Sequence, residues 1–292
     1  MNSKTGSPAP GRRVGVIIVT FNSQLVIKRC IDAIMAQSRI PDVVVVVDNN
    51  SSDRSYLGFL AELSNCKLQL RPDNDGFCRG NNLGLGDVSS CDYVVFLNPD
   101  AFLEKSFIEQ AIAIMENPAN STVGALSGAL IGFDVAAGVP SGKWDSAGIS
   151  QTWYGKWYDR RQGSAYVAEI DEPNSVEDVP ALCGALMFCR RTALQGVLLR
   201  GSEVFDETFF MYKEDIDLSL RLRRKGWRVG FCRSIYCYHG RGWKSRAKMS
   251  SLSKYLSARN ELRVCFRNRG KGLLYSSLKV LFVWFVGTAH DW

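Results

Sequence analysis

The chain has 292 residues, of which 46% are hydrophobic, so it can bury one full core in a domain slightly larger than usual. Its nine cysteines are odd in number and scattered, without a Cys-x-x-Cys spacing. This excludes a disulfide framework or a zinc site and is typical of reduced core residues in a cytoplasmic protein.

The net charge of +7 is uneven, because residues 221–271 hold 16 Lys and Arg against Glu261 alone. That basic segment predicts an anionic partner. No nucleic-acid-binding motif is present and the remainder is acidic, which argues against nucleic acid and leaves lipid head groups and diphosphates.

The first 130 residues alternate strand patterns with helical ones, after a flexible leader at residues 1–11 that lacks the apolar core of a signal peptide. Strands are predicted at residues 14–20, 43–47, 67–70, 93–98 and 123–130. Helices are predicted at about 25–35, 53–64 and 105–117, and the first is expected to be capped by Asn22 or Ser23. Residues 73–82 read as a long polar loop. This alternation of strands and helices predicts βαβ units and a mostly parallel sheet.

The strand predicted at residues 93–98 leads to a candidate ligand-binding carboxylate. Its run of five apolar residues, Tyr93–Leu97, is typical of a strand buried on both faces of a parallel sheet. Pro99 ends the strand and brings Asp100 to its carboxyl end, the edge at which open α/β sheets bind ligands. A carboxylate there, close to the amide of Asn98, can hold a divalent cation against a phosphate. The alternative is a plain Asn-Pro-Asp turn.

Polar residues also follow the other early strands, namely Asn22 and Asp48. Each alone is by default a turn residue, but three such strand ends at one sheet edge predict a pocket. The commonest nucleotide motifs are missing. No G-x-G-x-x-G follows the first strand, and residues 138–143 are one residue short of a P-loop. The sequence therefore disfavours a Rossmann dehydrogenase and a P-loop NTPase.

Residues 133–178 show little helical or strand period. A segment this long without regular structure is typical of a lid or a binding loop. It contains a group of aromatic residues: Trp144, Trp153, Tyr154, Trp157 and Tyr158. Such rings stack on sugars, so the segment is a candidate acceptor site, although rings that cover a flank of the domain explain the pattern equally well.

The second half of the chain supplies two further candidate site residues. A buried strand is predicted at 181–188, and an acidic start followed by Arg-Arg-Lys-Gly predicts a helix beginning near Glu214. The apolar approach Phe209–Met211 would hold Asp215 half-buried, where a carboxylate becomes a better base; ordinary helix-terminus charge is the alternative. Two short strands at 229–238 end at His239, which is either structural or a metal ligand.

Taken together, five motifs resemble the family 2 inverting glycosyltransferases with the GT-A fold, in particular the bacterial rhamnosyltransferase-like branch. The matching stretches are residues 16–22, 47–53, 74–84, 96–100 and 205–217 with His239. The resemblance covers about Val14 to His239. It implies a GT-A domain at 12–245, with a nucleotide-binding half at 12–130 and an acceptor and catalytic half at 131–245.

The resemblance also implies roles for individual residues. Thr20, Asn22 and Asn81 would line the nucleotide pocket, with Asn81 near the ribose or diphosphate, and Asp48 would accept a hydrogen bond from the pyrimidine N–H. Asn98 would lie beside the diphosphate, where it replaces the first Asp of the family's D-x-D motif and weakens the site for a hard cation. Asp100 and His239 would bind Mg²⁺ or Mn²⁺. Asp215 would deprotonate the acceptor hydroxyl.

The implied function is transfer of a sugar, L-rhamnose from dTDP-L-rhamnose, with a dTDP- or UDP-sugar as donor and a lipid-linked bacterial surface glycan as acceptor. Two alternatives remain. One is a sugar nucleotidyltransferase, although residues 20–23 do not form the glycine-rich basic loop of that class. The other is a non-catalytic carbohydrate-binding protein with the same fold.

The segment 246–292 is expected to be helical, basic and partly apolar. Its residues 273–286 are too short to span a bilayer and would bind an anionic membrane surface at the inner face of the cytoplasmic membrane, or pack on the fold.

Overall fold

The computed structural model describes residues 11–168, 174–241, 249–268 and 271–290. All but the last residue of the expected leader at 1–11 lies outside this range, and so does the expected boundary at 245/246. The nine cysteines are all free thiols, as predicted.

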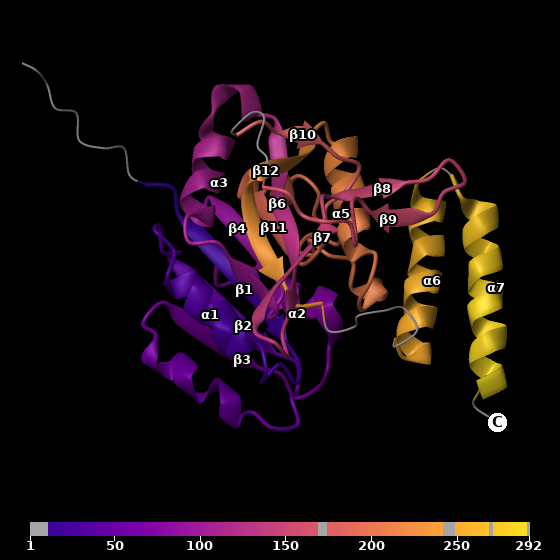
Figure 1. Ribbon diagram of the computed structural model, residues 1–292, viewed down its shortest axis with the longest axis horizontal. Coiled ribbons are helices and arrows are strands. Elements are labelled where there is room, and N and C mark those ends of the chain that lie inside the picture. The colour runs from indigo at the N-terminus through magenta and orange to yellow at the C-terminus, as the bar shows by residue number, and fades with distance from the viewer. Residues whose placement is uncertain (1–10, 169–173, 242–248, 269–270, 291–292) are drawn as a thin grey trace, which may run out of the picture.

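Four parallel strands form the first half of the central sheet (Figure 1). They lie in the order β3-β2-β1-β4 and comprise β1 (Val14–Thr20), β2 (Val43–Asp48), β3 (Cys66–Leu70) and β4 (Tyr93–Leu97). All five residues of β4 are buried, as its unbroken apolar run predicted. Because these strands are parallel, the carboxyl ends of β1, β2 and β4 lie at one edge of the sheet.

The second half of the sheet is mixed. Strand β11 (Leu186–Arg190) is antiparallel to both neighbours, β4 and β6 (Val123–Asp134), and β12 (Arg228–His239) runs parallel to β6. Shorter strands extend these long ones: β5 (Ala101–Leu103) and β10 (Glu177–Asp178) pair with β12, and β7 (Val139–Ser146) pairs with β6. A separate hairpin consists of β8 (Ile149–Gln151) and β9 (Trp157–Asp159). Strand β6 crosses the expected division at 130/131, so both halves share one sheet.

Helices cover both faces of the sheet and enclose two hydrophobic cores. One core lies under α1 (Ile27–Met35), α3 (Phe107–Glu116) and the 3₁₀ helix η1 (Ser55–Glu62). The other lies under α2 (Gly76–Gly84), α4 (Arg191–Gln195) and α5 (Glu214–Arg224). Short 3₁₀ turns occur at η2 (Pro118–Asn120) and η3 (Glu207–Phe209). The predicted α/β class, a mostly parallel central sheet flanked by helices, is confirmed.

A pair of C-terminal helices, α6 (Ser251–Arg267) and α7 (Leu273–His290), packs side by side at one flank, with α7 outermost (Figure 1). Ser250 caps α6 by accepting a hydrogen bond from the Ser253 N–H. Among the described residues, no helix has the length and apolar character needed to cross a membrane. We call α6 and α7 together the C-terminal hairpin.

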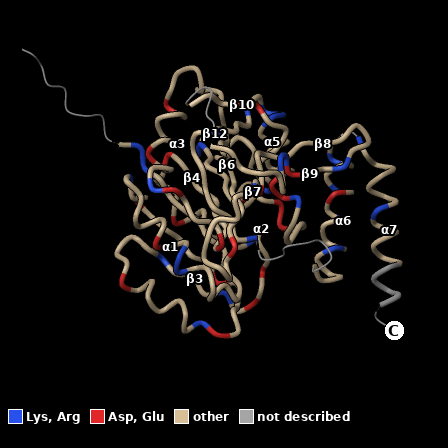
Figure 2. The backbone as a smooth tube through the Cα atoms, viewed as in Figure 1, with Lys and Arg blue, Asp and Glu red and all other residues tan. Residues whose placement is uncertain are grey.

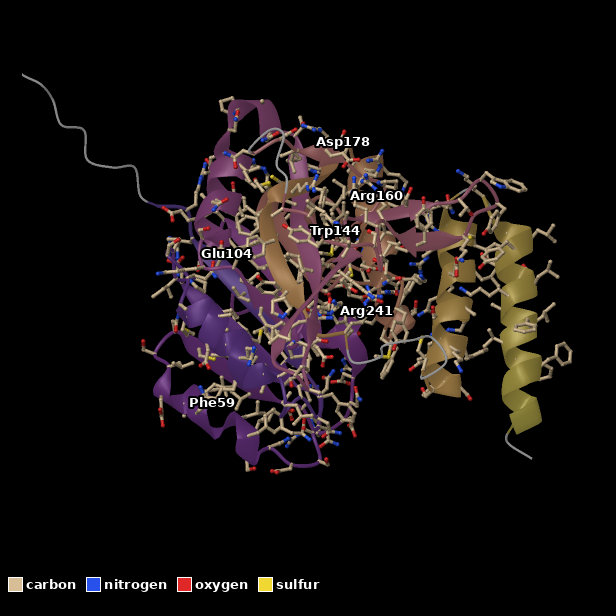
Figure 3. The ribbon with its side chains drawn as sticks, in the orientation of Figure 1. Phe59, Glu104, Trp144, Arg160, Asp178 and Arg241 are labelled. Atoms are coloured by element: carbon tan, nitrogen blue, oxygen red, sulfur yellow. The ribbon has the colours of Figure 1, made fainter. Side chains whose placement is uncertain are left out.

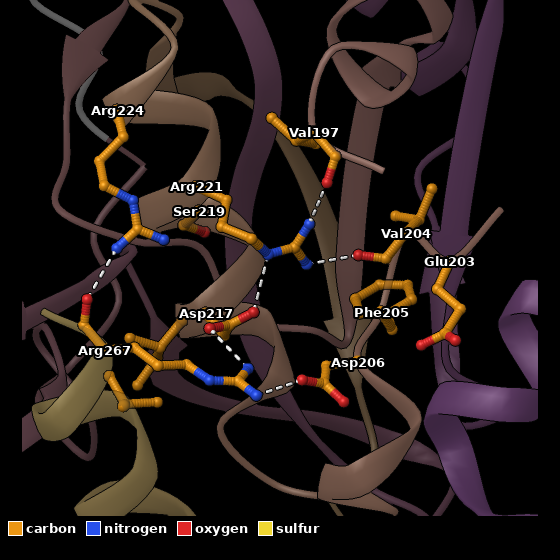
Figure 4. A network of polar contacts seen from close by, with 12 residues as sticks. Val197, Glu203, Val204, Phe205, Asp206, Asp217, Ser219, Arg221, Arg224 and Arg267 are labelled. Atoms are coloured by element: carbon orange, nitrogen blue, oxygen red, sulfur yellow. Dashed lines mark hydrogen bonds and ion pairs between the residues drawn. The ribbon is translucent and has the colours of Figure 1, made fainter. Parts of the chain in front are cut away.

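Several arginines of the basic segment 221–271 bind acids of the same chain, and two of them are drawn in Figure 4. Arg221 is buried, forms an ion pair with Asp217 at 2.8 Å and donates to two backbone carbonyls. Arg267 of α6 pairs with Asp206 and with Asp217, the latter at 3.3 Å, and so joins the hairpin to α5. The formal positive charge of residues 221–271 is therefore larger than the charge that an outside anion could bind. Helix α7 itself is almost entirely uncharged (Figure 2).

Several local predictions were wrong. Residues 76–84 form helix α2 instead of a polar loop, because its glycines allow close packing on β1: a Cβ on Gly80 would lie 2.8 Å from Val19, and one on Gly84 2.6 Å from Ile17. The irregular segment 133–178 contains the end of β6 and four further strands. Residues 228–239 form one strand, and a bulge near Cys232 interrupts its pairing with β6 where two strands were expected.

The predicted caps of α1 are also absent. Asn22 adopts a left-handed conformation (φ 51°), and its Oδ1 accepts hydrogen bonds from the backbone N–H and hydroxyl of Ser52. Ser23 contributes its backbone carbonyl, to which the N–H of Ile27 donates. Asn22 therefore joins the loops after β1 and β2, and no side chain caps α1.

Candidate active site

A cavity of about 650 Å³ opens beside the carboxyl ends of β4 and β12. It is the size of a small-molecule site and lies where α/β sheets usually bind ligands. Four of the predicted site residues line it together: Asn98, Asp100, Asp215 and His239. The rest of the wall comes mainly from the turn after β4, strand β9, the approach to β11 and the start of α5, with Phe77 of α2 and Ser257 of α6.

The first group of charged residues in this cavity is centred on His239, at the end of β12. Its Nε2 lies 3.3 Å from Asp100 Oδ1, and its Nδ1 lies 2.8 Å from Asp145 Oδ2. Asp145 also pairs with Arg241 at 2.7 Å, and Arg241 reaches Asp159 at 3.2 Å. Arg241 is labelled near the middle of the view in Figure 3, and its side chain is 19% exposed. We call these five residues the histidine cluster.

Two acids of the histidine cluster, Asp100 and Asp145, are held ionised. Burial raises the pKa values of Asp100 and Asp145, but the positive charge and hydrogen bonds of His239 outweigh it and leave both below the usual range. Burial by itself would lower the pKa of His239, whereas the two carboxylates raise it to about 10. The cluster is therefore a network of opposite charges in which each acid has a cationic neighbour.

A second group of acids begins helix α5. Asp215 accepts hydrogen bonds from the backbone N–H of Gly184 at 2.9 Å and from its own neighbour Ile216 at 2.8 Å. Gly184 permits this approach, because a Cβ there would lie 3.3 Å from Asp215 Cβ. Glu214 is buried, and its Oε2 has no hydrogen-bond partner among the described residues. We call Glu214 and Asp215 the acidic pair.

The acidic pair has elevated pKa values. Burial is the main cause for both residues, and it raises the pKa of Glu214 to about 8 with help from the negative charge of Asp215. Lys213 opposes the shift, but no ion pair forms with either acid among the described residues. A carboxylate with a raised pKa beside a cavity is a suitable proton acceptor near neutral pH.

Four other predicted site residues lie outside the cavity wall. Thr20 is buried at the end of β1 with its Oγ1 3.1 Å from the hydroxyl of Tyr56. Asp48 is buried at the end of β2 and accepts hydrogen bonds from Ser51 and Arg54, the latter at 2.7 Å.

Asn22 and Asn81 are the other two. Asn81 lies in α2, donates to the carbonyl of Phe77, and has a buried Oδ1 without a partner among the described residues. Asn22 occupies the loop after β1, where it contacts Ser52. These two residues, with Thr20 and Asp48, are therefore grouped around β1, β2 and α2, apart from the residues that line the cavity.

The aromatic residues of 144–158 lie in three settings: the core, the cavity wall and the surface. Trp157 and Tyr158 of β9 line the cavity. Trp144 is buried against Tyr166 with ring centroids 4.9 Å apart, and Trp153 is 88% exposed at the tip of the β8–β9 hairpin.

Sequence reasoning missed three members of the histidine cluster: Asp145, Asp159 and Arg241. Two of them belong to the segment that showed no regular period, and Asp145 is 94 residues from the histidine that it contacts. Arg241 follows His239 by two residues, and this spacing is the one local signal that could have identified it.

Comparison with known proteins gives the family. A family model described as glycosyl transferase family 2 matches residues 15–163, just over half of the chain. The chain is 26% identical over 226 residues to N-acetylglucosaminyl-diphospho-decaprenol L-rhamnosyltransferase of Mycobacterium tuberculosis, covering 73% of this chain and 71% of that protein. It is also 26% identical over 252 residues to the low-salt glycan biosynthesis hexosyltransferase Agl10 of Haloferax volcanii, covering 85% and 73%.

A match to glycosyltransferase GlyA of Streptococcus pneumoniae is 28% identical over 115 residues, which is 38% of this chain but 16% of that protein's length. Among solved structures, GalNAc-T7 with UDP, GalNAc and Mn²⁺ superposes with a TM-score of 0.67 at 14% identity, over 87% of this chain and 47% of the other. The mannosyltransferase PcManGT of Pyrobaculum calidifontis, with GDP-Man and Mn²⁺, gives a TM-score of 0.58 at 18% identity, over 96% and 76%. The chain therefore belongs to glycosyl transferase family 2 and has the GT-A fold that its motifs predicted.

Proposed function

We propose that this protein transfers a sugar from a nucleotide-diphosphate donor to a hydroxyl of a lipid-linked glycan, with inversion at the anomeric carbon. Our specific proposal for the donor is dTDP-L-rhamnose. The support is the resemblance of the motifs to the rhamnosyltransferase-like branch and the 26% identity to a relative named as an L-rhamnosyltransferase with a decaprenol-linked substrate. A UDP-sugar is the second candidate, because neighbouring structures contain UDP.

The observation that carries the proposal is the position of Asp215. It lines the same cavity as Asp100 and His239, its side chain is held by two backbone N–H groups, and its pKa is raised by burial. In the proposed reaction Asp215 takes the proton from the acceptor hydroxyl as that oxygen bonds to the anomeric carbon and the nucleoside diphosphate departs. One base is sufficient for inversion, and such assistance contributes roughly 10²–10⁴ in rate.

Asp100 and His239 fit a divalent cation, Mg²⁺ or Mn²⁺. A carboxylate oxygen and an imidazole nitrogen lie 3.3 Å apart at the cavity, and Asp145 holds Nδ1, so that Nε2 would face a cation after giving up its proton. No group of three or more His, Cys, Asp or Glu within the described ranges forms a complete metal site, so diphosphate and water oxygens would supply the remaining ligands. A cation held there supplies positive charge to the departing diphosphate.

The remaining predicted residues serve the donor in this proposal. Asn98 lines the cavity beside Asp100 and is assigned to the diphosphate. Thr20, Asn22, Asp48 and Asn81 are assigned to the nucleoside, around the ends of β1 and β2. The partnerless Oδ1 of Asn81 is a free acceptor for a ribose hydroxyl.

The two alternatives differ from this proposal in what they predict. A sugar nucleotidyltransferase would consume a nucleoside triphosphate and release pyrophosphate. A non-catalytic carbohydrate-binding protein would bind a glycan without releasing a nucleoside diphosphate from any donor.

The test is a donor screen followed by a transfer assay. A saturating ligand at about 100 times its Kd stabilises a protein by roughly 2.7 kcal/mol, so dTDP-, UDP- and GDP-sugars with and without Mn²⁺ can be ranked by thermal shift. We expect dTDP-L-rhamnose to give the largest shift and to transfer to a diphospholipid-linked sugar with inverted anomeric configuration by NMR. Release of pyrophosphate from dTTP, or no nucleotide-dependent shift at all, would overturn the proposal.

We also propose that α7 lies on an anionic membrane surface at the inner face of the cytoplasmic membrane, where a lipid-linked acceptor is met. The support is a row of exposed apolar side chains along this helix: Leu274, Leu278, Leu281 and Phe282 are 76%, 58%, 52% and 68% exposed. At about 1.5 Å per residue the helix is about 27 Å long, which suits binding in the interface.

Vesicle co-sedimentation tests this membrane contact. The protein should pellet with anionic but not neutral liposomes and be released by high salt, and Leu278→Glu with Phe282→Glu should abolish pelleting. Val139→Glu, at an exposed apolar site on β7, is the matched control and should pellet like the unmutated chain. Equal pelleting of both variants would assign α7 to another role.

A further inference from the structure

A side chain from the C-terminal hairpin holds the loop that leads into the acidic pair. Asn260 of α6 is fully buried, and its Nδ2 lies within hydrogen-bond distance of three carbonyl oxygens in this loop. These are the backbone carbonyls of Phe209 and Met211, each at 2.8 Å, and of Tyr212 at 3.0 Å. Arg259 donates to the Oδ1 of the same amide, which fixes its orientation.

The loop has an unfavourable backbone conformation. Phe210 (φ 64°, ψ −64°) is the centre of a γ-turn in which the N–H of Met211 donates to the carbonyl of Phe209 at 2.8 Å. Tyr212 and Lys213 follow with φ 71° and 73°. Left-handed backbone is disfavoured for residues with a Cβ, so three such residues in four persist only where surrounding contacts enforce them.

The same loop shapes the candidate active site. Met211, Tyr212 and Lys213 line the cavity, and Glu214 and Asp215 follow without a break. We propose that Asn260 is a positioning residue for catalysis: by binding three carbonyls of the loop 209–213, it holds Asp215 at the angle needed to reach the acceptor hydroxyl. This inference rests on the proposed function, in which Asp215 is the base.

The hairpin is rigid enough to do this because the next residue anchors it. Glu261 is fully buried, accepts a hydrogen bond from the Trp157 N–H at 3.2 Å, and forms an ion pair with Lys279 of α7. Trp157 also lines the cavity. Two adjacent buried polar residues of α6 thus connect the hairpin to the loop before α5 and to β9.

The test compares Asn260→Ala with Asn268→Ala in the full-length protein. Asn268 lies just after α6, donates to the Val264 carbonyl and accepts from Arg224 at the far end of α5, and no hydrogen bond joins it to the loop 209–213 among the described residues. We expect Asn260→Ala to lower kcat about a hundredfold, the loss typical of a small displacement of a catalytic group, while the donor Kd changes less than about twofold. Hydrogen exchange should accelerate in residues 209–213 and stay unchanged in β1 and β4. Asn268→Ala should leave kcat and this exchange pattern as they are.

Two further variants keep the inference falsifiable. Asn260→Ser retains one hydroxyl donor and should give an intermediate kcat if the alanine variant unfolds. Asn260→Asp keeps the shape but presents acceptors to three carbonyls, and should lose as much kcat as alanine. If Asn260→Ala retains kcat within about twofold while Asp215→Asn is inactive, the positioning role is wrong and the base assignment stands. If Asp215→Asn retains activity, the proposed function, with Asp215 as the base, is wrong, whatever the result for Asn260.

Discussion

Two sets of buried acids lie at one cavity, and their surroundings shift their pKa values in opposite directions. In the histidine cluster, Asp100 and Asp145 each have a cationic neighbour, and their pKa values lie below the usual range. In the acidic pair, Glu214 and Asp215 have backbone N–H groups and each other as neighbours, and their pKa values are raised. The difference shows that surroundings, and not residue type, decide which carboxylate stays charged and which binds a proton more readily. In the proposed reaction the charged acid lies beside the diphosphate and the other is the base.

The acidic pair shows which physical effect dominates. Its position in the first turn of α5 places both acids near the positive end of the helix dipole, which stabilises a negative charge by about 0.3–1 kcal/mol at exposed sites. Burial acts in the other direction and can raise a carboxyl pKa by several units, each worth about 1.4 kcal/mol. Burial prevails here, and so the acids at the start of α5 bind a proton more readily than exposed carboxylates do.

The largest effect should come from removing the base. Asp215→Asn keeps the shape of the side chain but cannot accept the proton, so we expect kcat to fall by about 10³ or more, within the range of general-base contributions. Single-turnover transfer with saturating donor measures this. Retention of more than about a tenth of wild-type turnover would move the base to Glu214.

A smaller effect should follow from disturbing the histidine cluster at a distance from the substrate. Asp145→Asn removes the carboxylate that orients His239 Nδ1, and loss of such an orienting partner typically costs 10–100-fold in metal affinity or activity. We expect a fall of about that size in donor affinity measured with Mn²⁺. Asp178→Asn, which breaks the exposed ion pair with Arg228, is the control. Equal affinities for the two variants would remove Asp145 from the site.

The smallest effect on turnover, and one mainly on stability, should come from Glu214→Gln. Because folding raises the pKa of Glu214 from an ordinary 4.5 to about 8, the folded state binds its proton more tightly. The stability that Glu214 contributes is therefore present below about pH 4.5 and lost as the pH rises through 8. Urea unfolding at pH 5 and pH 8.5 should show the wild type losing on the order of 1–3 kcal/mol relative to Glu214→Gln. Parallel pH dependences would mean that Glu214 is not held protonated.

Much of the sheet and part of the site could be predicted from the sequence, because their signals are local. The apolar runs of β1, β2 and β4 identify buried strands by themselves, and Pro99 after such a run places Asp100 at the sheet edge. The start of α5 could be predicted in the same way, from three acids followed by basic residues along one helix.

What could not be predicted depends on contacts between distant residues. Asp145 acquires its role from His239, and Asn260 from carbonyls some 50 residues earlier in the chain. Helix α2 was missed because glycine and asparagine disfavour helices, whereas here Gly80 and Gly84 are needed for packing against β1. The positive charge of the C-terminal region was overvalued for a similar reason, since Arg221 and Arg267 bind acids of the fold.

Our central proposal is that Asp100, in the histidine cluster, binds the donor through a cation, whereas Asp215, in the acidic pair, accepts the proton. Calorimetric titration of the donor tests this proposal most directly. Wild type, Asp215→Asn and Asp100→Ala would each be titrated with dTDP-L-rhamnose, with and without Mn²⁺. We predict that Asp215→Asn binds the donor like the wild type and shows the same enhancement by Mn²⁺, whereas Asp100→Ala binds weakly and is insensitive to the ion. Loss of donor binding in Asp215→Asn, or an unchanged Mn²⁺ enhancement in Asp100→Ala, would contradict the account.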